Sequence, residues 1–138
     1  MDAKVTWKTG LSFTGETGSG FQIPLGTAVD HGGDGSAPGP MEVVLVALGG
    51  CTAMDVISIL EKKQQKVSGF EIKVHGDRAE AHPKVYTDIT LEYIVTGTNL
   101  DPEAVKRAVE LSETKYCSVN AMLKKTANVT TKVTLKEA

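Results

Sequence analysis

The two cysteines are the side chains of this sequence best suited to covalent chemistry. Cys51 lies inside a long apolar segment, directly after two glycines, and Cys117 lies where one predicted helix ends and another begins. They form no Cys-x-x-Cys pair, and two cysteines alone do not complete a four-ligand zinc site. A buried cysteine is usually an inert apolar residue, whereas a thiol at a helix N-terminus near a cation, as Cys117 is near Lys115, can have a lowered pKa. The residues alone therefore leave two interpretations, thiol chemistry and simple packing.

A second group of possible ligands lies in a glycine-rich loop that ends at Pro40. Asp30, His31 and Asp34 could bind a metal, but three polar residues in such a loop are common without one, so we expect no metal. Residues 14–20 are also rich in glycine, but they do not match the patterns that cradle phosphate groups. We expect a hairpin connection there and no bound cofactor.

Composition excludes several classes of protein. The 138 residues predict one soluble domain, residues 1–138, with enough core to fold without disulfides. A net charge of −2 and 5% aromatic residues argue against nucleic-acid binding, which usually needs a basic surface and stacking side chains. The first eight residues lack the apolar stretch of a secretory signal, so we expect a cytoplasmic protein with reduced thiols. Residues 43–60 are apolar, but they contain Asp55, which favours a buried core helix over a membrane span.

Hydrophobic periodicity predicts an α+β fold in the order β-β-β-α-β-β-α-β, with mostly antiparallel pairing. Three short strands are expected within residues 5–25, and a long helix from Pro40 to Lys63. The further strands are expected near residues 70–75, 85–95 and 129–135; helices are expected after Asp101-Pro102 and at residues 118–124. The long helix is apolar on nearly every side, which is more than one small sheet covers, so a partner subunit is expected. Gly49-Gly50 at its centre would allow another backbone to approach closely.

Four sequence blocks around the cysteines resemble the OsmC/Ohr superfamily, the osmotically inducible and organic-hydroperoxide-resistance proteins. These blocks are residues 36–42 (SAPGPME), 48–56 (LGGCTAMDV), 82–85 (HPKV) and 111–119 (LSETKYCSV). The resemblance implies an intertwined homodimer, in which the two long helices pack together inside the sheets and the active sites lie at the subunit interface. It also implies a thiol peroxidase, in which the Cys51 thiolate attacks a hydroperoxide and becomes a sulfenic acid. Cys117 would resolve that acid as a disulfide, which a dithiol reductant reopens.

The sequence departs from the family pattern at the residues that activate the thiolate. The hydroperoxide reductases of the family carry an N-terminal arginine, held by a glutamate directly after the proline that opens the helix. Here the first arginine is Arg78, and Pro40 is followed by Met41 and then Glu42. On a regular helix Glu42 lies about 180° from Cys51, so it is only a weak catalytic candidate.

Other charged residues are candidates for influencing Cys51. Asp55 lies one helical turn beyond it, where a carboxylate would raise the pKa of a thiol. Lys8, His31 and His82 are candidates for the missing cation, and the sequence does not choose among them.

Three functions compete at this point. The first is a dimeric, cysteine-based peroxidase that acts on organic hydroperoxides. The second is a non-catalytic protein that binds small apolar molecules on the same scaffold, and the third is another thiol-dependent reaction, such as hydrolysis or thiol transfer. A Cys51 pKa below about 7 would favour nucleophilic chemistry, and one above about 8.5 would favour the binding protein.

Overall fold

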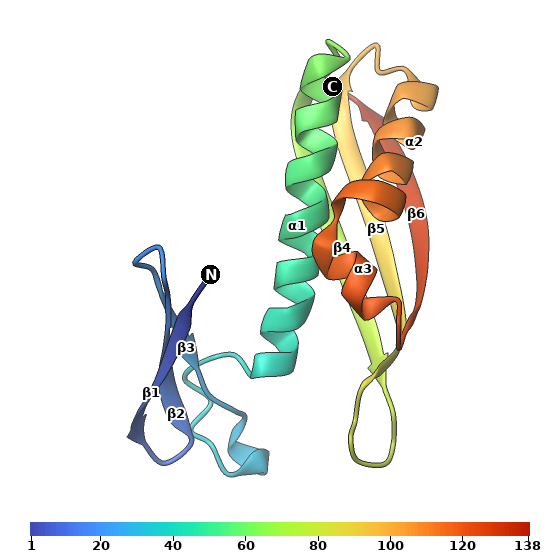
Figure 1. Ribbon diagram of the computed structural model, residues 1–138. Coiled ribbons are helices and arrows are strands. Elements are labelled where there is room, and N and C mark those ends of the chain that lie inside the picture. The colour runs from blue at the N-terminus through green and yellow to red at the C-terminus, as the bar shows by residue number, and fades with distance from the viewer. The chain divides into compact units, whose positions relative to one another are not determined.

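The computed structural model describes residues 1–138, and the chain divides into two compact units, residues 1–44 and 45–138. Each unit holds one three-stranded sheet (Figure 1). The α+β class predicted from the periodicity is therefore confirmed.

The N-terminal unit is an antiparallel meander of short strands. They are β1 (Ala3–Thr9), β2 (Ser12–Thr17) and β3 (Gln22–Leu25). Strand β2 extends through the first four residues of the glycine-rich segment 14–20, which was predicted to be a hairpin connection throughout. The turn itself is closed by the Thr17 amide, which donates to the Phe21 carbonyl at 2.9 Å. Only the end of the glycine-rich segment therefore forms the hairpin connection.

A loop with one 3-10 turn, η1 (Val29–His31), connects the meander to helix α1 (Pro40–Lys62). The start of α1 is capped by Glu42, whose Oε2 accepts a hydrogen bond from the Gly39 amide at 2.8 Å. A glutamate at the third helical position reaches back in this way in the capping box. The predicted start of the long helix at Pro40 is confirmed.

The C-terminal unit is built on a second sheet in the order β4-β5-β6. Its strands are β4 (Lys66–Arg78), β5 (Tyr86–Thr98) and β6 (Asn128–Glu137). The long strands β4 and β5 are antiparallel, but β6 runs parallel to β5. The predicted, mostly antiparallel pairing is therefore confirmed, and β5–β6 is the one parallel pair. The chain between β5 and β6 holds helices, and this helical crossover returns the chain to the end of the sheet at which β5 begins, so that β6 runs parallel to β5.

That crossover contains α2 (Pro102–Leu111), a π-helical turn η2 (Ser112–Tyr116) and α3 (Ser118–Leu123). A helix begins directly after Asp101 as predicted, and Asp101 caps it, because its side chain accepts a hydrogen bond from the Glu103 amide at 3.0 Å. In the ribbon, α1 and the α2–α3 segment cover the same side of the β4-β5-β6 sheet (Figure 1). This arrangement brings the middle of α1 against the end of α2.

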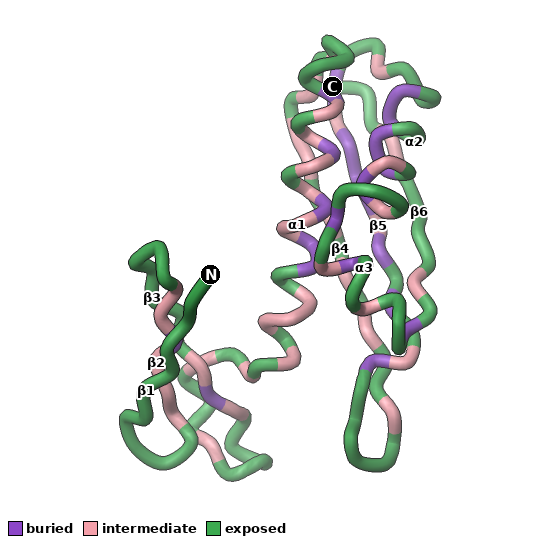
Figure 2. The backbone as a smooth tube through the Cα atoms, viewed as in Figure 1, coloured by how far each residue is buried: buried purple, intermediate pink, exposed green.

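The core of this unit lies between α1, α2 and strand β5 (Figure 2). Four residues of α1 at a spacing of four are fully buried and form one stripe along the helix: Leu48, Thr52, Val56 and Leu60. Opposite them, β5 contributes Ile89, Leu91, Tyr93 and Val95, and α2 contributes Ala104, Val105, Ala108 and Val109. The long helix is thus packed on one side by its own chain.

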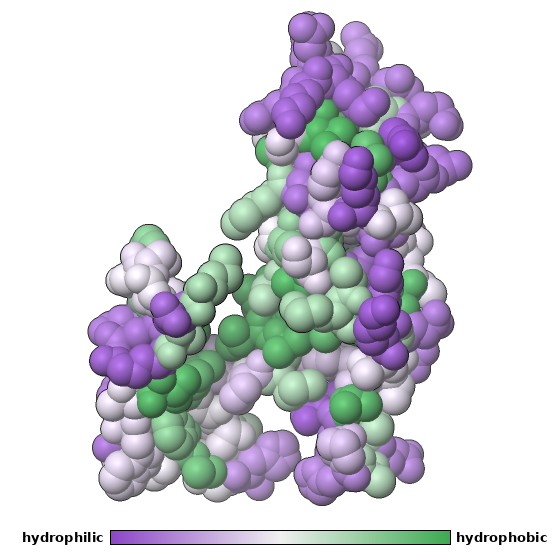
Figure 3. Space-filling view, in the orientation of Figure 1, coloured by the Kyte–Doolittle hydropathy of each residue, from purple (hydrophilic) through white to green (hydrophobic).

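The other side of α1 is open within the single chain. Val46 and Met54 are 72% and 76% exposed, and a Cβ atom added at Gly50, which lies between them at the same spacing, would meet nothing within 4 Å. Apolar side chains gather over α1 in Figure 3. Gly49, in contrast, is buried, and a Cβ atom there would lie 3.2 Å from Val74 of β4. Of the two glycines expected to admit another backbone, only Gly50 is free to do so.

By length and composition alone, α1 could cross a membrane. In the structure, however, one side of α1 is buried in the protein core, because the stripe that begins at Leu48 is covered by the chain's own sheet and helices. Asp55 also lies in the middle of the helix and accepts a hydrogen bond from α2–η2. A carboxylate at that position is costly in lipid.

Candidate functional site

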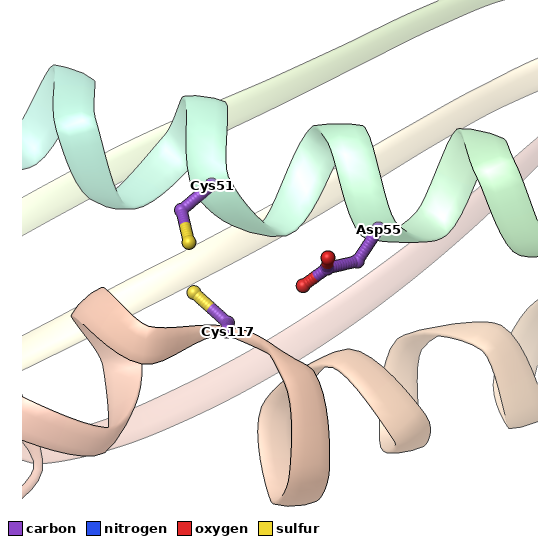
Figure 4. A group of neighbouring side chains, drawn as sticks. All are labelled: Cys51, Asp55 and Cys117. Atoms are coloured by element: carbon purple, nitrogen blue, oxygen red, sulfur yellow. The ribbon is translucent and has the colours of Figure 1, made fainter.

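The structure brings the two predicted cysteines together. Cys51 lies near the middle of α1 and Cys117 lies between η2 and α3, and their sulfur atoms point toward each other (Figure 4). Both are free thiols. The Asp55 side chain comes from the next turn of α1, and one ligating atom from each of these three residues lies within 4.8 Å of the others.

The two thiols differ in their access to solvent. Cys51 is half-buried, whereas Cys117 is only 3% exposed. The Cys117 sulfur caps α3 by accepting a hydrogen bond from the Asn120 amide at 3.4 Å. The half-buried Cys51 is therefore the thiol that a solute can reach first, and the buried Cys117 lies behind it.

The expected lowering of the Cys117 pKa is wrong. Burial raises the pKa of this thiol to about 11, and the neighbouring Cys51 and Asp55 add to the rise, although the Asn120 amide acts in the opposite direction. The Lys115 ammonium group instead lies over the Tyr116 ring, with its Nζ 5.2 Å from the ring centre. Desolvation of the thiolate thus outweighs the favourable position at the helix start.

A buried hydrogen-bonded chain extends from Asp55 into the core. Ser112 donates to Asp55 Oδ2 at 2.9 Å, and its Oγ also lies 2.7 Å from the Thr52 hydroxyl. Thr52 lies 2.7 Å from the Tyr93 hydroxyl, which donates to Glu113 Oε1 at 3.3 Å. Burial, with the help of the Glu113 carboxylate, raises the pKa of Tyr93 above its ordinary value, so the phenol keeps its proton.

Most of this series of hydrogen-bonded side chains was not predicted from the sequence. From the sequence, Asp55 was expected to favour a core helix and to raise the pKa of a thiol, but neither Thr52 nor Ser112 was predicted to belong to a site. The available signal was a polar residue at a core-facing helical position, which describes both Thr52 and Ser112. Buried hydroxyl groups require partners, so two such positions indicate a polar contact between helices.

The other candidate residues have local structural partners. Glu42 caps the start of α1, as described above. Asp34 Oδ1 accepts hydrogen bonds from the Ser36 amide at 3.0 Å and the Ser36 hydroxyl at 2.6 Å, and these bonds lower the pKa of Asp34. Asp30, His31 and Asp34 do not gather into a cluster of ligating atoms as Cys51, Asp55 and Cys117 do.

The structure does not place any of the candidate cations beside Cys51. Lys8 and His31 belong to the N-terminal unit, whereas the thiols belong to the other unit. His82 is exposed in the loop between β4 and β5. The arginines are engaged elsewhere: Arg78 Nε donates to the Lys84 carbonyl at 2.8 Å, and Arg107 pairs with Glu110 at 3.6 Å.

The donor set of the thiol site could hold a metal only under a restrictive condition. Two thiolates and one carboxylate, with one open position, are ligands that Zn²⁺ accepts. Both thiols must first lose their protons. The high pKa of Cys117 opposes that loss near neutral pH.

The N-terminal unit contains a separate apolar cavity of about 640 Å³. Its lining includes Val5, Leu11, Phe13, Leu25 and His31. Cavities of this size and character are typical of sites for small apolar molecules.

Comparisons with known proteins agree on one family. A sequence model described as OsmC-like protein matches residues 33–132. Protein YhfA of Escherichia coli strain K12 is 49% identical over 130 residues, which make up 94% of each chain.

Solved structures have the same architecture. A hypothetical protein from Aquifex aeolicus VF5 is 33% identical, with a TM-score of 0.88 over 99% of this chain and 96% of that chain. A protein from Legionella pneumophila described as an organic hydroperoxide resistance protein OsmC has a TM-score of 0.71 over 96% and 95% of the two chains. Its identity is 15%, so that likeness concerns the fold alone.

Proposed function

The chain belongs to the OsmC-like protein family, and from that premise we propose that it is a cysteine-based thiol peroxidase that reduces organic hydroperoxides. One observation carries the proposal: two free thiols face each other, one of them half-buried and the other buried behind it. A peroxidatic thiol must be reached by its substrate, and a resolving thiol must only reach the first sulfur. The substrate class proposed here is the one named in the description of a protein with the same fold, an organic hydroperoxide resistance protein.

The proposed reaction has two steps on the protein. The Cys51 thiolate attacks one oxygen of the hydroperoxide, so that an S–O bond forms and the O–O bond breaks. The alkoxide takes up a proton and leaves as the alcohol, and Cys51 becomes a sulfenic acid. Cys117 then attacks the Cys51 sulfur, which forms the disulfide and releases water. A dithiol reductant restores both thiols by exchange.

We further propose that the protein acts as a cytoplasmic homodimer. The open side of α1, with Val46, Gly50 and Met54 at a spacing of four, supports an interface with a second copy. Burial of the exposed Val46 and Met54 side chains against a second copy would favour association, because it removes apolar area from water.

A thiol count tests the proposed activity. Reduced protein is titrated anaerobically with cumene hydroperoxide, and free thiols are measured after each addition. We expect two thiols to be lost for one equivalent of hydroperoxide, and Cys51→Ser to consume none. Wild-type protein that keeps both thiols after several equivalents would exclude the peroxidase.

The cavity of the N-terminal unit favours a second candidate function, the binding of small apolar molecules. This function does not need the thiols. It predicts that a Cys51→Ser/Cys117→Ser double variant binds an apolar fluorescent probe as tightly as the wild type does. Probe binding without any consumption of hydroperoxide would favour the binding protein over the peroxidase.

A further inference from the structure

Asp55 is the one carboxylate beside both thiols, and the reaction described above gives it no role. Its oxygen and the two sulfur atoms lie within 4.8 Å of one another. That separation allows proton transfer through one water molecule, or directly after a small side-chain movement, because hydrogen bonds used in catalysis are often long before the substrate binds. Asp55 is half-buried and is held in place by Ser112 at 2.9 Å.

The hydrogen-bonded side chains that extend from Asp55 into the core have one donor proton fewer than they have contacts. In order, they are Asp55, Ser112, Thr52, Tyr93 and Glu113, joined by four contacts at 2.9, 2.7, 2.7 and 3.3 Å. Each of the three hydroxyl groups supplies one proton, and ionised carboxylates supply none. Three protons therefore serve four contacts. If Asp55 gains a proton it donates to Ser112, each hydroxyl then donates to the next, and every contact is filled.

We propose that Asp55 is the general base that removes the proton of the Cys117 thiol as the disulfide forms, and that the buried hydroxyl chain stabilises the proton on Asp55. This inference rests on the proposed peroxidase function, since it concerns the second step of that reaction.

The step balances without another reactant. Asp55 takes the thiol proton, and the Cys117 sulfur attacks the Cys51 sulfenic acid. The S–S bond forms as the S–O bond breaks, and the leaving hydroxide takes the proton from Asp55 to become water. The Cys117 sulfur is oxidised and the Cys51 sulfur is reduced by equal amounts, so no outside electron donor is needed.

A base is needed because Cys117 is a poor source of thiolate. Burial keeps its pKa near 11, so only about one thiol in ten thousand is ionised at pH 7. The titratable groups around Asp55 are the two thiols, and along the hydroxyl chain Tyr93 and Glu113. Tyr93 keeps its proton, and Glu113 lies at the far end, where Thr131 also donates to it. Asp55 is thus the carboxylate within reach of Cys117.

The charge of Asp55 and its role as a base predict opposite effects of Asp55→Asn. If Asp55 acted only through its charge, its removal would lower the pKa of Cys117 and speed disulfide formation. If Asp55 is the base, its removal slows that step. Asparagine can donate to Ser112 as the protonated carboxyl group would, so the variant keeps the chain hydrogen-bonded.

The decisive measurement follows the second step alone. Reduced protein receives one equivalent of cumene hydroperoxide, and samples are quenched over time and analysed by mass spectrometry for sulfenic acid and disulfide. We expect Asp55→Asn to form the disulfide about 10- to 100-fold more slowly at pH 7, and Asp55→Glu to recover part of that loss. From pH 6 to 9 the Asp55→Asn rate should increase close to tenfold per unit, because only preformed thiolate reacts, while the wild-type rate changes much less.

A second reagent separates failure of this inference from failure of the proposed function. Ellman's reagent places a nitrothiobenzoate group on Cys51, and attack by Cys117 then releases nitrothiobenzoate, which is followed by its absorbance. This attack needs the same proton removal but no hydroperoxide. Wild-type protein inert to hydroperoxide would overturn the peroxidase, whereas disulfide formation in Asp55→Asn at or above the wild-type rate with either reagent would overturn the role of Asp55.

Two further variants complete the design. Asp88→Asn removes an exposed carboxylate from β5 and should leave the release of nitrothiobenzoate within about twofold of the wild type. If Asp55→Asn does not fold, Ser112→Ala takes its place, because it breaks the hydroxyl chain at Asp55. It should slow the release about fivefold, and an unchanged rate with unchanged pH dependence would overturn the proposal.

Discussion

Cys51 and Cys117 present their sulfur atoms to each other from α1 and from the start of α3, but only Cys51 is open to solvent. The contact is thus asymmetric. A solute reaches the first sulfur, and the second sulfur is placed where it can react with whatever the first becomes. The roles assigned to the two thiols follow from this difference in exposure and not from their order in the sequence.

Alkylation should distinguish the thiols. With iodoacetamide at pH 7.5, Cys51 should be modified first, because Cys117 is buried and has a pKa near 11. Raising the pH to 10 should increase the rate at Cys117, since the thiolate is the reactive form. Peptide mass spectrometry after short exposures gives both rates. Faster modification of Cys117 at pH 7.5 would contradict the burial described here.

The sequence, through its resemblance to a family, was sufficient to predict that the two cysteines lie close together, and its periodicity predicted the class of fold. The motif blocks around Cys51 and Cys117 identified the family, which the comparisons confirm, and the Pro40 and Asp101-Pro102 signals located the starts of α1 and α2. The helix starts are local features, because capping and helix periodicity depend on residues a few positions apart. The dimer and the role of Glu42 stay predictions.

The remaining features depend on contacts between distant residues. Alternation predicted β6, but it carries no information on strand direction, so the parallel pairing with β5 was missed. Thr52 meets Tyr93 and Ser112, which are 41 and 60 residues away, and no spacing rule connects them. Lys115 is near Cys117 in sequence, yet the π-helical turn ends with its ammonium group over the Tyr116 ring. Proximity in sequence was therefore a poor guide to the charge around the thiol.

Alkaline pH should destabilise the reduced protein partly through Cys117. In the unfolded chain this thiol ionises near its ordinary pKa of 9.0, but in the folded protein its pKa is about 11. Between these values the unfolded state binds fewer protons, so the free energy of unfolding falls as pH rises. Urea denaturation at pH 8, 9 and 10 should show a smaller decline for Cys117→Ser than for the wild type. Equal declines would indicate an ordinary pKa for the thiol.

Tyr93→Phe should weaken the core without creating a cavity. The ring still packs edge-on against Phe70 at 6.5 Å, but the hydrogen bonds to Thr52 and Glu113 are lost. We expect a loss of about 1–2 kcal/mol in the free energy of unfolding, measured by urea denaturation. Tyr116→Phe, at an exposed site, is the control and should change stability by less than about 0.5 kcal/mol. Similar effects of the two variants would show that the buried hydrogen bonds of Tyr93 contribute little to the free energy of unfolding.

Met54→Lys should disrupt the proposed dimer. Met54 is 76% exposed on the open side of α1, so lysine costs the single chain little, but a charge there would be buried against a second copy. Sedimentation velocity at micromolar concentration should show a dimer for the wild type and a shift toward monomer for Met54→Lys. Met122→Lys, which alters an exposed methionine of α3, is the matched control. A wild-type monomer would argue against both the dimer and a shared active site.

Cys117→Ser should separate the two steps of the proposed reaction. With the resolving thiol removed, Cys51 should still consume the first equivalent of cumene hydroperoxide and then stop as a sulfenic acid, because no second sulfur faces it. Dimedone should trap that acid, and further hydroperoxide should oxidise it to the sulfinic acid, both detected by mass. Cys51→Ser is the control and should show neither product. The buried position of Cys117 makes serine a conservative replacement, so loss of folding is not expected to obscure the result. If Cys117→Ser turned over at the wild-type rate with a dithiol reductant, the reductant would be attacking Cys51 directly, and the facing thiol would have no part in the cycle.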